Sequence, residues 1–338
     1  MSKKHADRWR RWLRIRGMSQ VLTVTAGLIV LCIIFGIMSP NFFSGRNIGN
    51  LLRQIAPIIL IGIGQSYVLI TGNIDLSIGS VVGMSCMLSA TLMTRGVPSV
   101  AASAAALLAS MLVGLLNGSL VARCKLPPFI ATLGTMTIAR GIAQIVNNNY
   151  NTDAIGDHAQ GFRDLFYYGN TLGIYNTVWI ALILFLILNF ILRKTPTGQY
   201  IYAVGSNISA AGLLGVDTKF TVIIVYLVSS LCAGIVGLVT CAISGMGTMD
   251  AGNMYEMYAV AASVIGGVST LGGQGLLFGT VIGAAIWGVL QNGLQFAGAP
   301  VAIRNIVIGA IVIVSVLLDV VIRSGSFRHL KAKGQNNK

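Results

Sequence analysis

The sequence predicts an all-α membrane protein, a polytopic bundle of about ten transmembrane helices, because of its composition and the placement of its charges. Hydrophobic residues make up 55% of the 338 residues, charged residues make up only 9%, and the mean hydropathy is +0.79. In soluble proteins about a quarter of all residues are charged, because charged residues cover the surface. Most of the surface of this chain therefore faces something other than water.

The basic residues are concentrated at the two ends of the chain. Of the 23 Lys and Arg residues, seven lie within 1–16 and five within 323–338. Because they flank apolar segments, they follow the positive-inside pattern of membrane proteins rather than forming a basic face for nucleic acid. We therefore expect a cytoplasmic N-terminal tail over 1–17, a transmembrane domain over 18–322, a cytoplasmic C-terminal tail over 323–338 and an even number of crossings.

Each predicted helix is an apolar run of about the 20 residues that a helix needs to cross the hydrocarbon core. The first run is longer than the core of a signal peptide and has no A-x-A cleavage site after it, so we expect a retained helix. The eighth run is interrupted by Glu256. The runs are 18–38, 51–71, 76–94, 97–122, 126–146, 177–192, 220–243, 254–270, 276–298 and 300–322.

Basic residues in the loops agree with this topology. Arg123 and Lys125 follow the fourth run, and Arg193 and Lys194 follow the sixth, so both connections are expected in the cytoplasm. The segment 147–176 is then external. It combines three aspartates with six aromatic side chains, which suits either docking of a protein or a solvated loop whose aromatics cap the bundle. The three aspartates are Asp153, Asp157 and Asp164.

Glycine pairs and one repeated pattern indicate how the helices pack. GxxxG pairs lie in three runs, and such pairs let helix backbones approach closely in lipid. The pattern Gly114–Gly118 in the fourth run is similar to Gly288–Gly293 in the ninth. If runs 2–5 and 7–10 are duplicated halves, five crossings separate the two patterns, and the halves form an inverted repeat.

The chain lacks the groups that most catalytic mechanisms need. It has no Gly-Lys pair and hence no phosphate loop of the Walker type, no paired histidines, and one glutamate. We therefore expect no enzyme activity, no metal and no cofactor. A stand-alone secondary transporter would need charged groups inside the bundle. The candidates for that role are Asp75, Arg140, Glu256, Arg304 and Asp319.

The most informative polar motif is Gly72–Gly79, which joins the second and third runs. One interpretation is a tight turn, in which Gly72 ends one helix and Asp75 caps the next. The other places Asn73, Asp75 and Ser77 in a polar cavity, since irregular backbone at membrane depth requires cover by protein or water.

A second motif lies in the cytoplasmic segment 196–218. Asn207 is expected to cap the N-terminus of a short helix over 208–214, which Gly215 closes. A short helix held between two spans on the cytoplasmic side suits docking of another protein.

Together these motifs resemble one family, the membrane permease of bacterial ABC sugar importers of the ribose, galactose and xylose type. The resemblance covers residues 20–322, and the turn and the glycine-rich segment are its most specific parts. The matching pieces are Ser39–Phe43, Asn73–Ser77, Pro127–Gly134, Tyr202–Asn207 and Glu256–Gly275.

The resemblance implies a homodimeric permease without ATPase activity in the bacterial cytoplasmic (inner) membrane. Its partners would be a cytoplasmic ABC ATPase subunit, a periplasmic or extracellular sugar-binding protein and membrane lipid. Such permeases carry a coupling helix with the pattern E-A-A-x-x-x-G, which Ala210, Ala211 and Gly215 match, whereas Ser209 replaces the acid. With Asn207 as the cap, these residues are the expected ATPase contact.

On this basis the sequence predicts ATP-driven import of a monosaccharide by alternating access. The alternatives are an ABC permease for a nucleoside, an inositol or a signalling sugar derivative, and a stand-alone secondary transporter. The residues expected to line the pathway are Asn73, Asp75, Ser77, Asn117, Phe129, Thr132, Gln291 and Asn292.

Overall fold

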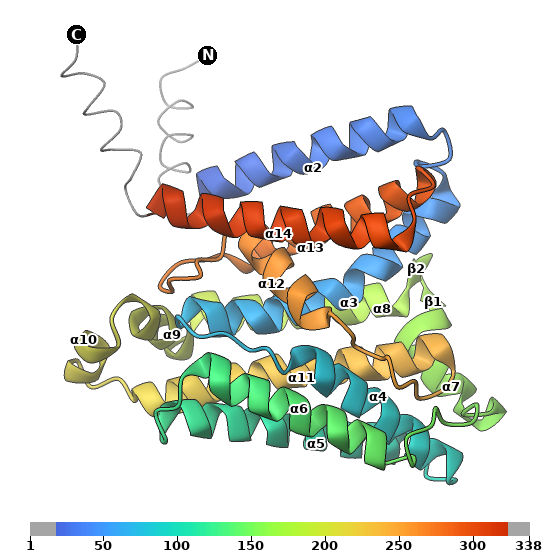
Figure 1. The fold of residues 1–338 in the computed structure, drawn as a ribbon, viewed down its shortest axis with the longest axis horizontal. Helices are drawn as coiled ribbons and strands as arrows, with labels where there is room; N and C mark the ends of the chain where they lie inside the picture. The colour runs from blue at the N-terminus through green and yellow to red at the C-terminus, as the bar shows by residue number, and fades with distance from the viewer. Residues whose placement is uncertain (1–17, 324–338) are drawn as a thin grey trace.

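The computed structural model describes residues 18–323, and the tails predicted over 1–17 and 324–338 lie outside the described residues. Most of the long helices lie roughly side by side, with α9 and α10 at one end and the β1–β2 hairpin and α7 at the other (Figure 1). The elements are α2 (Met18–Met38), α3 (Gly45–Ile70), α4 (Ile78–Thr94), α5 (Ser99–Ala122), α6 (Pro128–Ile145), η1 (Asp157–Ala159), α7 (Gln160–Arg163), η2 (Asp164–Tyr168), β1 (Asn170–Thr171), β2 (Ile174–Tyr175), α8 (Asn176–Lys194), α9 (Pro196–Ser206), α10 (Ile208–Leu213), α11 (Thr218–Ser244), α12 (Tyr255–Ile265), α13 (Leu277–Phe296) and α14 (Val301–Arg323).

Every predicted apolar run overlaps one of these α-helices. In the described part of the chain, α2, α3, α5, α8, α11 and α13 are the six helices that length and composition alone make able to cross a membrane. Helices α4 and α12 have only 17 and 11 residues. The molecule is a multi-pass helical membrane protein, and the count of about ten crossings stays a prediction.

Helix α12 corrects the helix expected over 254–270. Its 11 residues span about 16 Å, roughly half of the hydrocarbon core. It ends at Ile265 because Gly266 and Gly267 follow, and Gly267 adopts the left-handed conformation with φ of 89°. The chain then continues as a glycine-rich loop to Leu276, and α13 begins at the next residue.

Helices α4 and α12 start inside the bundle and run in opposite directions. The segment before α4 enters from the end of the molecule that carries α9 and α10, whereas the segment before α12 enters from the end that carries α7 (Figure 1). An inverted repeat of α3–α6 and α11–α14 would produce this arrangement, and the repeat itself remains a prediction.

Two of the three GxxxG pairs lie at close helix contacts, as the sequence predicts, and the third, Gly79 and Gly83, lies against the segment before α12 and the side chains of Glu256 and Arg140. Gly114 and Gly118 of α5 lie against α11, and Gly279 and Gly283 of α13 lie against α12 and its C-terminal end. Helix α11 occupies the centre, where it packs on α3, α4 and α5. Within the most apolar 18-residue stretch of each helix, 72% of the residues are buried in α11, but only 11% in α2 and 22% in α8. The outer helices therefore present apolar side chains to lipid.

The first turn of α2 and the last turn of α14 lie at the same end of the molecule as α9 and α10 (Figure 1). This placement agrees with an even number of crossings. The positive-inside pattern predicts that this end faces the cytoplasm.

The predicted external loop covers the opposite end. Phe162 is 4% exposed and packs into the bundle, and the guanidinium of Arg53 lies 4.3 Å from the ring centres of both Tyr167 and Tyr175. Asp153 is exposed. Most of the aromatic side chains thus cap the bundle, whereas acidic groups face outward.

Candidate functional site

The carboxylate of Asp75 is the centre of a buried hydrogen-bond network. Its Oδ1 accepts from the backbone N–H (2.9 Å) and the hydroxyl (2.6 Å) of Ser77, and its Oδ2 accepts from the Ser229 hydroxyl at 2.7 Å. Asn117 Nδ2 donates to the Ser77 hydroxyl at 2.9 Å, and the Thr135 hydroxyl donates to Asn117 Oδ1 at 2.6 Å. These five residues, the Asp75 network, join the start of α4 to α5, α6 and α11. All five are buried.

The backbone before α4 is extended and is also satisfied by protein groups. The Tyr226 hydroxyl donates to the carbonyl of Ile74 at 3.0 Å, and the backbone N–H of Asn73 donates to the carbonyl of Val68 at 3.2 Å. Asn73 Nδ2 donates to the Thr71 hydroxyl at 2.8 Å. Irregular backbone at membrane depth is stable when protein supplies its hydrogen bonds.

This geometry differs from the turn predicted with Asp75 as the cap of the next helix. Ser77 occupies the N-cap position and its side chain makes no capping bond. Asp75 instead accepts from Ser77 and Ser229, so its carboxylate fixes the extended segment to α11. Sequence reasoning missed Ser229 and Thr135, because single hydroxyls in apolar runs give no pattern.

The N-terminal ends of α4 and α12 meet in the middle of the bundle. Gly79, in the first turn of α4, lies directly against the side chain of Glu256 and the backbone of Gly252. Glu256 is in the first turn of α12. A carboxylate is stabilised near the positive end of a helix dipole, and here it lies near two of them.

Arg140 of α6 stabilises the irregular segment before α12 through hydrogen bonds to its backbone. Its Nη1 donates to the carbonyls of Met249 (3.2 Å) and Ala251 (2.9 Å). A guanidinium within the bundle requires such partners, because an unsatisfied charge in hydrocarbon is costly.

Two of the predicted pathway residues lie at the start of α6. Phe129 is 56% exposed, whereas Thr132 is fully buried and donates to the carbonyl of Pro128 in its own helix at 2.8 Å. The Phe129 ring therefore lies on the surface of the described bundle, whereas the Thr132 side chain lies inside it.

The remaining two predicted pathway residues lie on α13, away from the Asp75 network. Helix α13 packs chiefly on α2, α3 and α12. Asn292 and Asn47 form a reciprocal amide pair, with bonds of 3.0 and 3.1 Å. Gln291 is half-buried and lines a separate cleft.

This cleft, which we call the aromatic cleft, has a volume of about 320 Å³. The Tyr258 and Trp287 rings lie in it with centres 4.6 Å apart, and the centres of Tyr255 and Tyr258 are 5.6 Å apart. Sequence reasoning named Gln291 as a pathway residue and Arg304 as a charged group inside the bundle, but it did not bring them together. The four-residue spacing of Trp287, Gln291 and Gln295 places these three on one face of α13. The lining residues are Arg53, Gln54, Pro57, Ile58, Tyr167, Ile243, Tyr255, Tyr258, Trp287, Gly288, Gln291, Gln295 and Arg304.

The short helix predicted after Asn207 is confirmed. Helix α10 begins at Ile208, and Asn207 Oδ1 accepts from the backbone N–H of Ala210 at 2.9 Å. Gly215 follows with a φ of 83°, which ends the turn. Leu213 and Leu214 are 90% and 85% exposed, so the helix presents an apolar tip away from the bundle.

The expected coupling residues fall on both sides of this helix. Ser209 and Ala210 are exposed, whereas Ala211 is 2% exposed and packs into the bundle. One side of α10 thus attaches it to the chain, and the other is available for contact.

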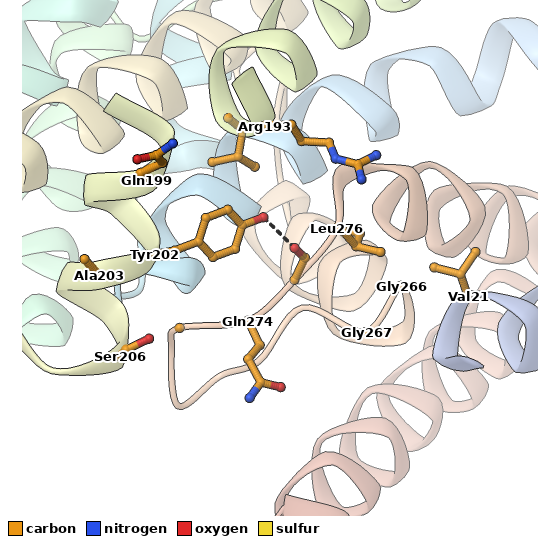
Figure 2. Close-up of a pocket in the computed structure, with 13 residues that line it drawn as sticks. Val21, Arg193, Gln199, Tyr202, Ala203, Ser206, Gly266, Gly267, Gln274 and Leu276 are labelled. Carbon is orange, nitrogen blue, oxygen red and sulfur yellow. Dashed lines mark hydrogen bonds between the residues drawn. The ribbon is translucent and has the colours of Figure 1, made fainter. Parts of the chain in front are cut away.

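A cavity of about 470 Å³ lies between α9 and the loop 266–276, which we call the glycine loop. Tyr202 points across it and donates to the carbonyl of Gly275 at 2.6 Å, with Arg193 nearby (Figure 2). The backbone N–H of Gly273 also donates to the carbonyl of Ile70 at 2.8 Å. Burial raises the pKa of Tyr202 to about 12, so its hydroxyl remains a donor at physiological pH.

The described residues contain no group of three or more His, Cys, Asp or Glu side chains that could hold a metal ion. Most of the polar side chains described above bind one another or the backbone instead. Buried polar junctions inside an apolar bundle, an aromatic cleft and a short exposed helix at one end together define a polytopic membrane transport protein.

The comparisons with known proteins identify the family. Residues 47–316 match the family described as the permease component of branched-chain amino acid transport systems. The chain belongs to this family of membrane permeases, which are subunits of ABC transporters and not themselves enzymes. No solved structure matches the chain.

Within the family, several relatives are named for sugars. The D-allose transport system permease protein of Escherichia coli is 37% identical over 86% of this chain and 89% of its own length. The ribose import permease protein of Bacillus subtilis is 36% identical over 90% and 94%. The L-arabinose ABC transporter permease protein of Azospirillum brasilense is 32% identical over 90% and 89%. The resemblance to ribose-type sugar permeases is therefore confirmed.

Proposed function

We propose that this chain forms the translocation pathway of an ATP-driven importer that moves a monosaccharide into the bacterial cytoplasm. The membership in a permease family and three relatives named for ribose, D-allose and L-arabinose support the substrate class. Two copies of the chain would enclose the pathway in the inner membrane and alternate between outward and inward openings.

The observation that carries the proposed coupling is helix α10. Its tip exposes Leu213 and Leu214, which would face the cytoplasm by the positive-inside pattern. Two adjacent leucines exposed to water on a capped helix suit insertion into an apolar groove of a partner. The partner would be the separate ABC ATPase subunit, since this chain has no phosphate loop.

The opposite end would receive a sugar-binding protein. Asp153 and Asp157 are exposed on a segment whose aromatic side chains anchor it to the bundle. An acidic surface on a fixed support can orient a partner by charge.

We propose different roles for the pathway residues named from the sequence. Asp75, Ser77 and Asn117 use their hydrogen bonds on one another and would shape the pathway wall together with Asn73, Thr132 and Asn292. Gln291 lines the aromatic cleft, and Phe129 is exposed, so these two would be open to contact with solute or with the second copy.

The docking role is tested with the double variant Leu213→Asp, Leu214→Asp in the complete transporter. We expect loss of the co-purifying ATPase and at least a tenfold fall in ATP-driven uptake. A tenfold weaker association with the ATPase corresponds to a loss of about 1.4 kcal/mol in binding free energy. The matched control for ATPase recovery alone is Leu172→Asp, because Leu172 is 87% exposed on the opposite end, away from α10. Recovery of the ATPase at the wild-type level with the double variant would contradict the docking role of α10.

The substrate class and energy source are tested by uptake of labelled D-ribose, D-allose, L-arabinose and leucine. Sugar uptake that stops on ATP depletion and continues with a protonophore supports the proposal. Uptake of leucine alone would support the branched-chain amino acid description of the family, and uptake that follows a proton gradient would support a secondary transporter.

A further inference from the structure

We propose that the aromatic cleft between α3, α12 and α13 is the site where the permease itself holds the sugar during translocation, an inference that rests on the proposed function. The cleft lies at the first turns of α12, a helix of only 11 residues that starts inside the bundle. In transporters, substrate sites commonly form at such discontinuous helices near the middle of the membrane.

The lining of the cleft is incompatible with lipid tails. It includes two arginines and three glutamines, Arg53, Arg304, Gln54, Gln291 and Gln295. Arg53 packs on Tyr167 and Tyr175 of the predicted external loop, so the cleft lies toward that end of the bundle. Charged and amide groups there face the bundle interior or water, because hydrocarbon cannot satisfy them. The cleft therefore opens to the aqueous pathway or to the second copy of the chain that encloses it.

The chemistry of the lining suits a monosaccharide. A sugar ring has an apolar C–H face and a rim of hydroxyl groups. Tyr258 is half-buried and offers its ring to the cleft, while Trp287, 1% exposed, packs behind it at 4.6 Å and fixes its position. Gln291 and Gln295 follow Trp287 on the same face of α13 and supply amide donors and acceptors. Ligand sites of this kind combine aromatic walls with a few placed polar groups.

Two features favour a ligand rich in acceptor oxygens over an amine. Arg53 and Arg304 each have a buried Nε with no acceptor among the described residues, and the residues that line the cleft include no carboxylate. Pro57 also lacks the N–H that would bond the carbonyl of Arg53 in a regular helix. The hydroxyl groups of a neutral sugar can accept from the guanidinium groups and donate to this carbonyl.

The size of the cleft agrees with a small ligand held weakly. Its volume of about 320 Å³ lies at the lower end of the range for small-molecule sites. Weak binding is what a pathway requires, because the solute must also leave it.

The inference is tested in membranes that contain the permease, its ATPase and its binding protein, with D-ribose, D-allose and L-arabinose as probes. We expect Tyr258→Leu and Gln291→Leu each to lower uptake at least tenfold, while ATPase stimulation by the binding protein persists. The matched control is Gln144→Leu in α6, outside the cleft, which should keep uptake within twofold of wild type.

A chemical measurement covers the case in which these variants fold poorly. In a background that carries Cys124→Ser, because Cys124 is exposed, Gln295→Cys at an exposed position should react with a water-soluble thiol reagent and then lose uptake. Leu186→Cys on the apolar surface of α8 should not react. Uptake within twofold of wild type in the leucine variants, or after modification at 295, overturns the cleft assignment. Failure of the wild-type complex to import any of the three sugars contradicts the proposed function instead.

Discussion

The two helices that start inside the bundle differ in how deeply the polar residues at their N-terminal ends are buried. At α4, the preceding segment is closed: Asp75 and Ser77 are fully buried, and each polar atom of the carboxylate has a protein donor. At α12, the first turns are open: Tyr255, Glu256 and Tyr258 are half-buried, and the two tyrosines line a cleft. A helix that starts inside the bundle thus forms a fixed support in the first half of the chain and lines a candidate binding site in the second.

The largest expected effect is on stability at the closed junction. Asp75→Ala removes the acceptor for the Ser77 N–H and hydroxyl and for the Ser229 hydroxyl. Buried donors without a partner cost about 1–3 kcal/mol each, so we expect a loss of about 3 kcal/mol or more in the free energy of unfolding. Thermal unfolding in mild detergent measures it.

The matched control is Asp75→Asn, which keeps one acceptor oxygen and should cost about 1 kcal/mol. If Asp75→Ala unfolds at the temperature of the wild type, the junction is not a fixed support, and the contrast between the two helices is wrong.

An intermediate effect is expected where the two junctions touch. The methyl group of Gly79→Ala would overlap Glu256 and the backbone of Gly252 and force α4 and α12 apart. Such overpacking typically costs about 1–3 kcal/mol. We expect a lower unfolding temperature together with reduced sugar uptake.

Gly134→Ala in α6 is the control, because its new methyl group would meet no atom of the described chain within 4 Å. Equal behaviour of the two alanine variants would show that the half-helices are free to separate.

The smallest effect on stability is expected at the open junction. Glu256 is half-buried, so Glu256→Gln should change the free energy of unfolding by less than about 1 kcal/mol while the first turn of α12 stays in place. The same unfolding assay measures the change. A loss as large as that of Asp75→Ala would show that both junctions are structural supports, and the aromatic cleft would lose its special status.

The parts of the structure that the sequence predicted are those set by local contacts. Asn207 caps α10 through an N–H only three residues away, and Gly215 ends the turn, so the residue types are sufficient to predict the helix. The apolar runs likewise identify the helices, because hydropathy is a property of consecutive residues.

The remaining features depend on partners far along the chain. Hydropathy cannot show that 254–270 contains only a half-helix, since glycine and apolar residues continue past Ile265. Ser229 meets Asp75, and Asn47 meets Asn292, only after folding brings α11 to α4 and α13 to α3. The aromatic cleft had one local signal, the four-residue spacing of Trp287, Gln291 and Gln295.

The Asp75 network also has a consequence for the order of events during synthesis. The acceptor at Asp75 and the donor at Ser229 are 154 residues apart. At a synthesis rate of about 5–20 residues per second, the ribosome makes Ser229 about 8–30 s after Asp75. During that interval the carboxylate has no partner in α11 and cannot enter lipid alone. We therefore expect the segment before α4 to remain in water or against the insertion machinery until α11 has been inserted. Helix α4 would then reach its final position late, although it is synthesised early.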